Sequence, residues 1–132
     1  MALEKAILGY TKTQVPSVSD RVYALYAPQG TSKPYLVFTV VSNNFIHSLG
    51  EDSGLCETRV QFSVFGDGYA GVKGVVDELK AAYRNYVEGQ KTTEMSNEHW
   101  VQVTLLNAEV DMYEEDTGLF HTSLDVVFWH ME

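Results

Sequence analysis

Residues 58–86 read TRVQFSVFGDGYAGVKGVVDELKAAYRNY, and the spacing of the apolar residues changes within this stretch. From Thr58 to Phe65 apolar and polar residues alternate, which predicts a strand with one buried and one polar face. After Phe65 the apolar residues recur every three or four positions, which predicts a long helix. A strand with one polar face that runs directly into an amphipathic helix is typical of a layer of helices packed on a mainly antiparallel sheet.

The same patterns place the other elements around this unit. Apolar spacing predicts a short helix, β-branched and aromatic runs predict strands, and turn-forming residues separate them. The expected elements are a helix over 2–11, strands over 20–26, 35–42, 100–113 and 119–130, and polar loops over 43–55 and 87–98. The last two strands form a hairpin, with a bulge expected near Asn107. The sequence therefore predicts one α+β domain over residues 1–132, with about five mainly antiparallel strands packed against one long and one short helix.

Composition narrows the class of protein. Apolar residues make up 45% of the chain and charged residues 20%, as in ordinary globular proteins. No apolar run is long enough to cross a bilayer, and the first residues lack the pattern of a secretory signal, so we expect folding in a cytosol and no membrane contact. Cys56 is the single cysteine, which excludes an internal disulfide and a cysteine-based metal site.

The net charge is −9, from 18 acidic and 9 basic residues. An excess of negative charge opposes tight binding to the phosphate backbone of nucleic acids. Any contact with DNA is therefore expected to be repulsive or passive.

The segment from Gly66 to Gly71 spells G-x-G-x-x-G directly after a predicted strand. In dinucleotide-binding proteins this motif cradles a pyrophosphate within a parallel βαβ unit, with an acidic residue about 20 positions further on. Here that position falls in a loop, and Asp67 would repel a phosphate inside the cradle. We interpret the segment as a turn, with Asp67 capping the helix, and expect no cofactor.

Other polar groups resemble sites only superficially. His121, Ser123 and Asp125 alternate along one strand, and residues two apart are separated by roughly 6.6 Å, too far for a nucleophile and its base. The remaining histidines lack metal-ligand spacing, and Glu114-Glu115-Asp116 lacks the calcium-loop pattern. We expect no catalysis and no metal.

Two groups of apolar residues are candidate contact residues. The predicted long helix carries a tyrosine stripe that fits a core, although Tyr83 and Tyr86 near its end could reach a neighbouring subunit. Phe45, Ile46 and Leu49 lie in the predicted loop 43–55, where apolar side chains need a cover from the domain itself or from a partner. The candidate interface residues are Phe45, Ile46, Leu49, Tyr83 and Tyr86.

Several short motifs follow one another along the chain. They are Arg21-Val-Tyr23, Ala27-Pro28-Gln29-Gly30, Pro34-Tyr35-Leu-Val, Arg59-Val-Gln61 with Val64, and Tyr113-Glu-Glu-Asp116. In this order and spacing the chain resembles, over nearly its whole length, the tail-completion (tail-terminator) family of long-tailed bacteriophages. The chain departs from many relatives at Gly71 and Gly74, where their helix is richer in alanine and leucine.

The resemblance implies a structural virion protein that assembles, as a hexameric ring, on the end of the completed tail tube. Such a ring ends tail polymerisation and joins the tail to the head. Its implied partners are further copies of itself, the major tail tube protein and the head connector or stopper protein, with DNA only as passing cargo. The implied location is the head-proximal end of the virion tail, after assembly in the host cytoplasm.

Two alternatives remain open from the sequence. The closer one is another component of the head–tail neck, such as a stopper or an adaptor. The other is a small enzymatic or ligand-binding α+β domain, which would need polar groups that converge on a concavity.

Overall fold

The computed structural model describes residues 2–18, 20–48, 51–84 and 101–131. The element types and their order agree with the sequence pattern. The elements are α1 (Ala2–Gln14), β1 (Val22–Ala24), β2 (Tyr35–Ser48), β3 (Glu51–Gly66), α2 (Tyr69–Tyr83), β4 (Val101–Glu114) and β5 (Leu119–Met131). The predicted loop 87–98 lies outside the described residues.

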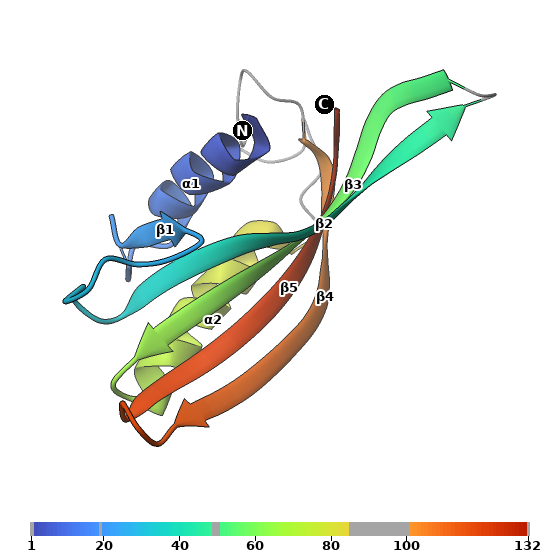
Figure 1. Cartoon of the computed structure of the whole chain (residues 1–132). Coiled ribbons are helices and arrows are strands. Elements are labelled where there is room, and N and C mark those ends of the chain that lie inside the picture. Colours follow the sequence, from blue (N-terminus) through green and yellow to red (C-terminus); the bar gives the residue numbers. More distant parts are fainter. Residues whose placement is uncertain (1, 19, 49–50, 85–100, 132) are drawn as a thin grey trace.

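The strands form one sheet in the order β1-β2-β3-β5-β4 (Figure 1). Among the described strands only β1 and β2 run parallel, and every other neighbouring pair is antiparallel. The expected bulge near Asn107 is confirmed, because the pairing of β4 with β5 shifts between Leu106 and Ala108. The mainly antiparallel α+β fold predicted from the sequence is therefore confirmed.

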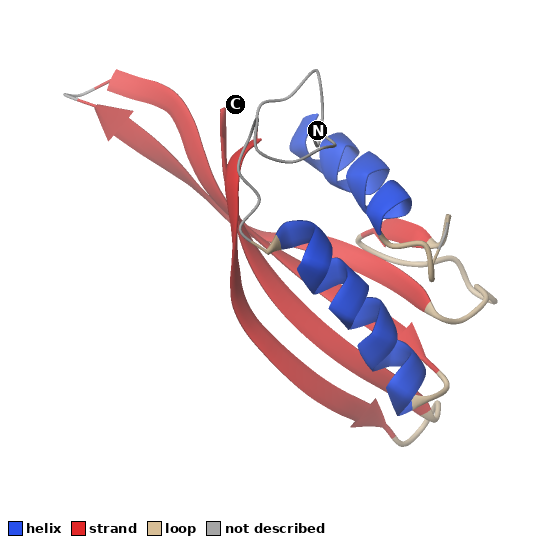
Figure 2. Ribbon diagram, turned by 180° about the vertical axis from the view of Figure 1, so that it is seen from behind, coloured by secondary structure: helices blue, strands red, loops and turns tan. Residues whose placement is uncertain are grey.

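Both helices pack on one face of the sheet (Figure 2). The alternation along β3 is confirmed, because Val60, Phe62 and Val64 are fully buried beneath α2. At the centre of the core the ring of Tyr83 lies 5.1 Å from that of Phe62 and 5.4 Å from that of Phe128. The apolar stripe of α2 and the apolar face of the sheet thus form one continuous core.

The prediction of a loop over residues 43–55 is wrong for most of this segment. Asn43 pairs with Thr58, and Phe45 pairs with Cys56, so β2 and β3 continue as a long hairpin. Turn-forming residues are tolerated there because cross-strand pairing outweighs the weak local propensity of each residue. The far end of the hairpin, residues 43–48 and 51–56, projects away from both helices and is called the arm below (Figures 1 and 2).

Candidate interaction surface

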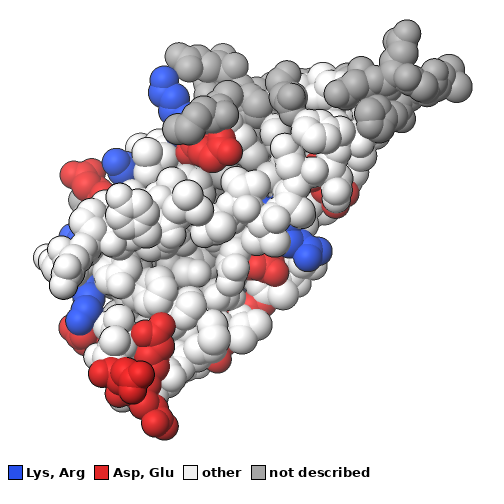
Figure 3. Space-filling model, in the orientation of Figure 1, with Lys and Arg blue, Asp and Glu red and all other residues white. Residues whose placement is uncertain are grey.

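The sheet face opposite the helices is open and carries few charges. Space-filling Figure 3 views this face, on which most of the described surface is uncharged. Acidic side chains gather at the end that holds the β4–β5 turn, where the sequence reads Glu114-Glu115-Asp116. A face with few charges on a chain of net charge −9 is a candidate surface for contacts with other proteins.

Large apolar side chains are exposed along β4. Leu105 and Met112 are each 45% exposed, and Val110 is 53% exposed. They pair with Val127, His121 and Ser123 of β5, which places them on the open face. A second exposed pair lies on β2, where Val41 is 53% and Phe45 is 46% exposed. Exposed apolar residues therefore gather on two strands at opposite sides of the sheet.

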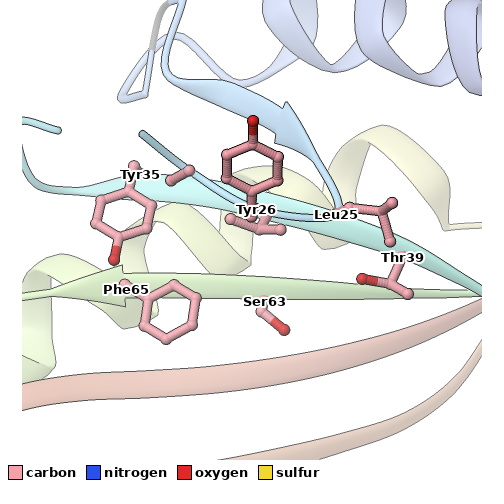
Figure 4. Close-up of a pocket in the computed structure, with 8 residues that line it drawn as sticks. Leu25, Tyr26, Tyr35, Thr39, Ser63 and Phe65 are labelled. Atoms are coloured by element: carbon pink, nitrogen blue, oxygen red, sulfur yellow. The ribbon is translucent and has the colours of Figure 1, made fainter. Parts of the chain in front are cut away.

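A row of aromatic rings crosses the open face near the start of β2. The ring of Tyr35 stacks on that of Phe65 at 5.1 Å, and Phe65 stacks on His121 at 4.3 Å. Leu25 and Tyr26, both strongly exposed, help to enclose a pocket of about 240 Å³ beside this row (Figure 4). Leu25 has φ +72°, a conformation that costs energy for a residue other than glycine. The pocket is smaller than most ligand sites, which hold about 300–1,000 Å³.

His121 and Ser123 lie closer together than the strand spacing predicts. The Nε2 atom of His121 is 3.3 Å from the Oγ atom of Ser123. Ser123 also accepts a hydrogen bond of 3.0 Å from the amide of Gln61. Burial lowers the pKa of His121, against an opposing effect of Glu114. Among the described hydrogen bonds none joins His121 to Asp125, so the third member of a hydrolytic triad is not in place.

The glycine-rich turn has a packing role at its first position. A Cβ atom at Gly66 would lie 2.7 Å from Cγ2 of Val72, closer than carbon atoms approach. Gly66 therefore lets the start of α2 pack directly on the end of β3. The strands flanking α2, β3 and β4, do not pair with each other, because β5 lies between them and is antiparallel to both. The adjacent parallel strands of a dinucleotide-binding unit are absent from this described region.

The prediction that Asp67 caps α2 is wrong. Gly68 occupies the N-cap position of α2, and no side chain caps the helix there. Asp67 instead forms an ion pair with Lys33 at 3.2 Å, in which both side chains are exposed. An exposed pair of this kind contributes little to stability. A pocket of about 190 Å³ between these residues and Gly71 is shallow and carries one charge of each sign.

An ionic cluster that the sequence analysis missed joins α2 to β4. Lys80 contacts Glu109 at 2.6 Å, and Lys73 contacts both Glu109 and Asp111. The two lysines hold the pKa of Glu109 below its ordinary value, and hydrogen bonds from Thr122 and then Lys73 and Tyr69 lower the pKa of Asp111. The available signal was the spacing of Lys73 and Lys80, which are two helical turns apart on one face.

The candidate contact residues have different positions. Tyr83 is completely buried, so it belongs to the core and cannot contact a neighbouring subunit. Its hydroxyl lies 2.6 Å from that of Thr11, which ties α2 to α1. Phe45 and Ile46 lie on the arm, where Phe45 is exposed and Ile46 is half-buried. Leu49 and Tyr86 lie outside the described residues.

Within the described residues, no group of three or more histidine, cysteine or carboxylate side chains could hold a metal ion. Cys56 is buried. Neither α1 nor α2 has the length and apolar character that a membrane-spanning helix needs.

Comparisons with known proteins identify a similar fold but do not identify a family for this chain. No protein-family model matches the chain. No curated protein matches it either. Among solved structures, the chain is similar to one described as the virion of a native gene transfer agent particle, with a TM-score of 0.64 and 14% sequence identity. The match covers 99% of this chain and 98% of that one, so the two share a fold from end to end.

Proposed function

We propose that this chain is a structural protein of a phage-like virion. The observation that carries the proposal is the end-to-end fold match to a chain of a gene transfer agent virion, over 99% of this chain. The match supports the proposal because it extends over the whole described fold and not only over one part of it. An open face with few charges and a projecting arm are features that a protein built for contacts with other proteins would need.

Within the virion, we assign the chain to tail completion. The ordered motifs from Arg21 to Asp116 support this assignment, because they follow the pattern of the tail-terminator family in order and spacing. In this role copies of the chain form a ring, hexameric in the family, on the finished tail tube. The ring stops tube growth and provides the surface that joins the head connector or stopper.

The mechanism depends on shape rather than catalysis. The core of α2 and the sheet forms a rigid body, and the arm carries Phe45 beyond it. We propose that the arm contacts the tube, the connector or a neighbouring copy. The His121 and Ser123 pair has a structural role here, since it stiffens the open face next to the aromatic row.

The negative charge of the chain fits a ring around a DNA channel. DNA that passes through such a ring must not adhere to it, and a net charge of −9 per copy repels phosphates. DNA is therefore cargo and not a ligand in this proposal. Salt-independent, tight DNA binding by the purified chain would contradict it.

Deletion of the gene from the genome that encodes the particle tests the proposal. We expect electron micrographs of the lysate to show filled heads without tails and tails of irregular length, and a plasmid copy of the gene to restore joined particles. Immunogold labelling of intact particles should place the protein between head and tail. Normal particles without the gene would overturn the proposal.

The same experiment separates the closest alternative. A stopper or adaptor binds the head side of the neck, so its loss leaves tails of normal length and heads that leak DNA. Tails of uniform length in the deletion lysate would therefore favour that role over tail completion.

A further inference from the structure

The outer edge of β4 lacks the usual protection against strand pairing. Among the described strands β4 is an edge of the sheet, and its 14 residues contain no lysine, arginine or proline. Natural edge strands are usually short, or carry lysine, proline or a bulge that blocks pairing. The two register shifts with β5, between Val101 and Val103 and between Leu106 and Ala108, leave the seven residues from Ala108 to Glu114 in regular register. This half of β4 is therefore able to accept another strand.

Two of the three acidic residues of this half-strand are neutralised by lysines of α2, and the third, Glu114, lies at its last position. Glu109 and Asp111 face α2 and are paired with Lys73 and Lys80. On the other face of the strand, Val110 and Met112 are exposed. The edge thus offers backbone groups flanked by apolar side chains and a neutralised ionic cluster.

The opposite edge of the sheet has a matching uncharged stretch. β1 pairs with β2 only at Leu36–Phe38, and beyond Phe38 no described strand pairs with β2 on that side. The residues from Thr39 to Phe45 contain no charged side chain, and Val41 and Phe45 are exposed among them. Two copies that each carry a charge of −9 repel each other, and uncharged surfaces such as these add no further repulsion to a contact.

We propose that the second half of β4 pairs with the stretch of β2 beyond Phe38 in a second copy of this chain. This inference rests on the proposed function, which requires contacts between copies. The strand directions are compatible with this contact. β2, β3, β5 and β4 alternate in direction across the sheet, so β2 of the next copy can lie antiparallel to β4. The helices of both copies then lie on the same side of one continuous sheet.

Sterics and side-chain faces select the register. β1 of the second copy occupies the edge of β2 at Leu36–Phe38, so Glu114 at the end of β4 must lie at or beyond Val40. Paired residues share a face, and both Met112 and Ser42 lie on the open face, as their partners His121 and Arg59 show. The first register that meets both conditions places Met112 opposite Ser42 and Val110 opposite Asn44.

This contact explains why exposed apolar residues gather at two separate edges. One copy contributes Val110 and Met112 on the open face, opposite Asn44 and Ser42 of the next copy. The next copy contributes Val41 at its register shift and Phe45, which lies on the helix-side face and falls opposite Glu109. Because the two surfaces differ, the contact is heterologous and propagates into a ring or a filament. A two-fold contact between two β4 strands would cover only the first pair and leave Val41 and Phe45 in solvent.

Disulfide trapping with the purified full-length chain tests this contact. Copies carrying Met112→Cys are mixed with tagged copies carrying Ser42→Cys and oxidised at high protein concentration. Paired strands bring the two Cα atoms within disulfide distance, so we expect mixed dimers in large excess over dimers of either variant alone. The double variant should give a ladder of trimers and larger species. The native Cys56 is buried, and the native chain oxidised in the same way gives the background level of dimers.

Leu105→Cys provides the matched control, because Leu105 has the same 45% exposure as Met112 on the same strand. It lies seven residues away, roughly 24 Å along the strand, so it should not trap with Ser42→Cys. Val110→Cys with Asn44→Cys tests the same register with independent residues. Equal trapping by the control, or dimers only between Met112→Cys copies, would overturn the proposal, as would the absence of mixed dimers for both pairs. Localisation in particles fails or succeeds independently of this result, so the proposed function is judged separately.

Discussion

Gly66→Ala should destabilise the protein, because the added methyl group has no room. The new Cβ atom would lie 2.7 Å from Cγ2 of Val72, against an ordinary carbon contact of about 3.5–4.0 Å, an overlap of about 1 Å. Val72 is buried and β-branched, so it has essentially one rotamer in a helix and cannot turn away. The start of α2 must therefore move off the sheet.

Overpacking of this kind costs about 1–3 kcal/mol, and alanine returns about 0.4–1 kcal/mol by restricting the unfolded chain. We expect a net loss of about 1–2 kcal/mol in the free energy of unfolding, measured by urea titration followed by circular dichroism. Gly74→Ala is the matched control. Apart from its chain neighbours and the nearby backbone of α2, no atom lies within 4 Å of its added Cβ, and inside α2 the change should stabilise by about 1 kcal/mol.

A double-mutant cycle isolates the contact. Gly66→Ala should cost less in a Val72→Ala background, where the colliding methyl group is gone. If Gly66→Ala proved as stable as the native chain, or if its cost were unchanged beside Val72→Ala, the packing explanation for this glycine would be refuted.

Three further predictions follow from the contacts described above. Tyr83→Phe removes a fully buried bond to the hydroxyl of Thr11 and should lower the free energy of unfolding by about 1–2 kcal/mol in the same urea assay; an unchanged midpoint would mean that the bond contributes nothing. The pKa of Glu109 is lowered in the folded state, so its contribution to stability is present above its ordinary pKa of 4.5 and is lost as the pH falls through the lowered value. Glu109→Gln should therefore be less stable than the native chain at pH 7, with a gap that narrows in acid, and a constant gap in urea titrations from pH 7 to pH 3 would contradict the ion-pair explanation. Phe45→Ser changes an exposed residue on the arm, so the circular dichroism spectrum and thermal midpoint should stay native while complementation of a gene deletion fails to restore joined particles; full complementation would remove Phe45 from the contact surface.

Strong periodicity made most of the fold predictable. The alternation from Thr58 to Phe65 and the helical stripe after it are dictated by burial, and both are present as β3 and α2. The bulge near Asn107 was also predictable, because a polar residue there interrupts the strand pattern. The arm was not, since its residues have the composition of a loop and become strands only through pairing across the hairpin.

The candidate surface was less accessible to sequence reasoning. Tyr83 has the same chemistry in a core as at an interface, and only packing against Phe62 and Phe128 decides between them. The contacts of Lys73 and Lys80 with β4 depend on a strand that follows them by about 30 residues, so no local pattern reveals the partner. The edge position of β4 was also not predictable, because its sequence has the pattern of any half-buried strand and only the strand order of the sheet shows that it is an edge.

The position of β5 between β3 and β4 has a consequence for biosynthesis. Residues 51–66 emerge from the ribosome long before their neighbour at 119–131, and α2 and β4 are made in between. Until β5 is translated, β4 has no partner among the described strands and one edge of β3 is unpaired. A nascent chain halted at Gly118 would expose two unpaired strand edges, one on β3 and one on β4. Premature termination would therefore lead to aggregation rather than to a smaller folded product.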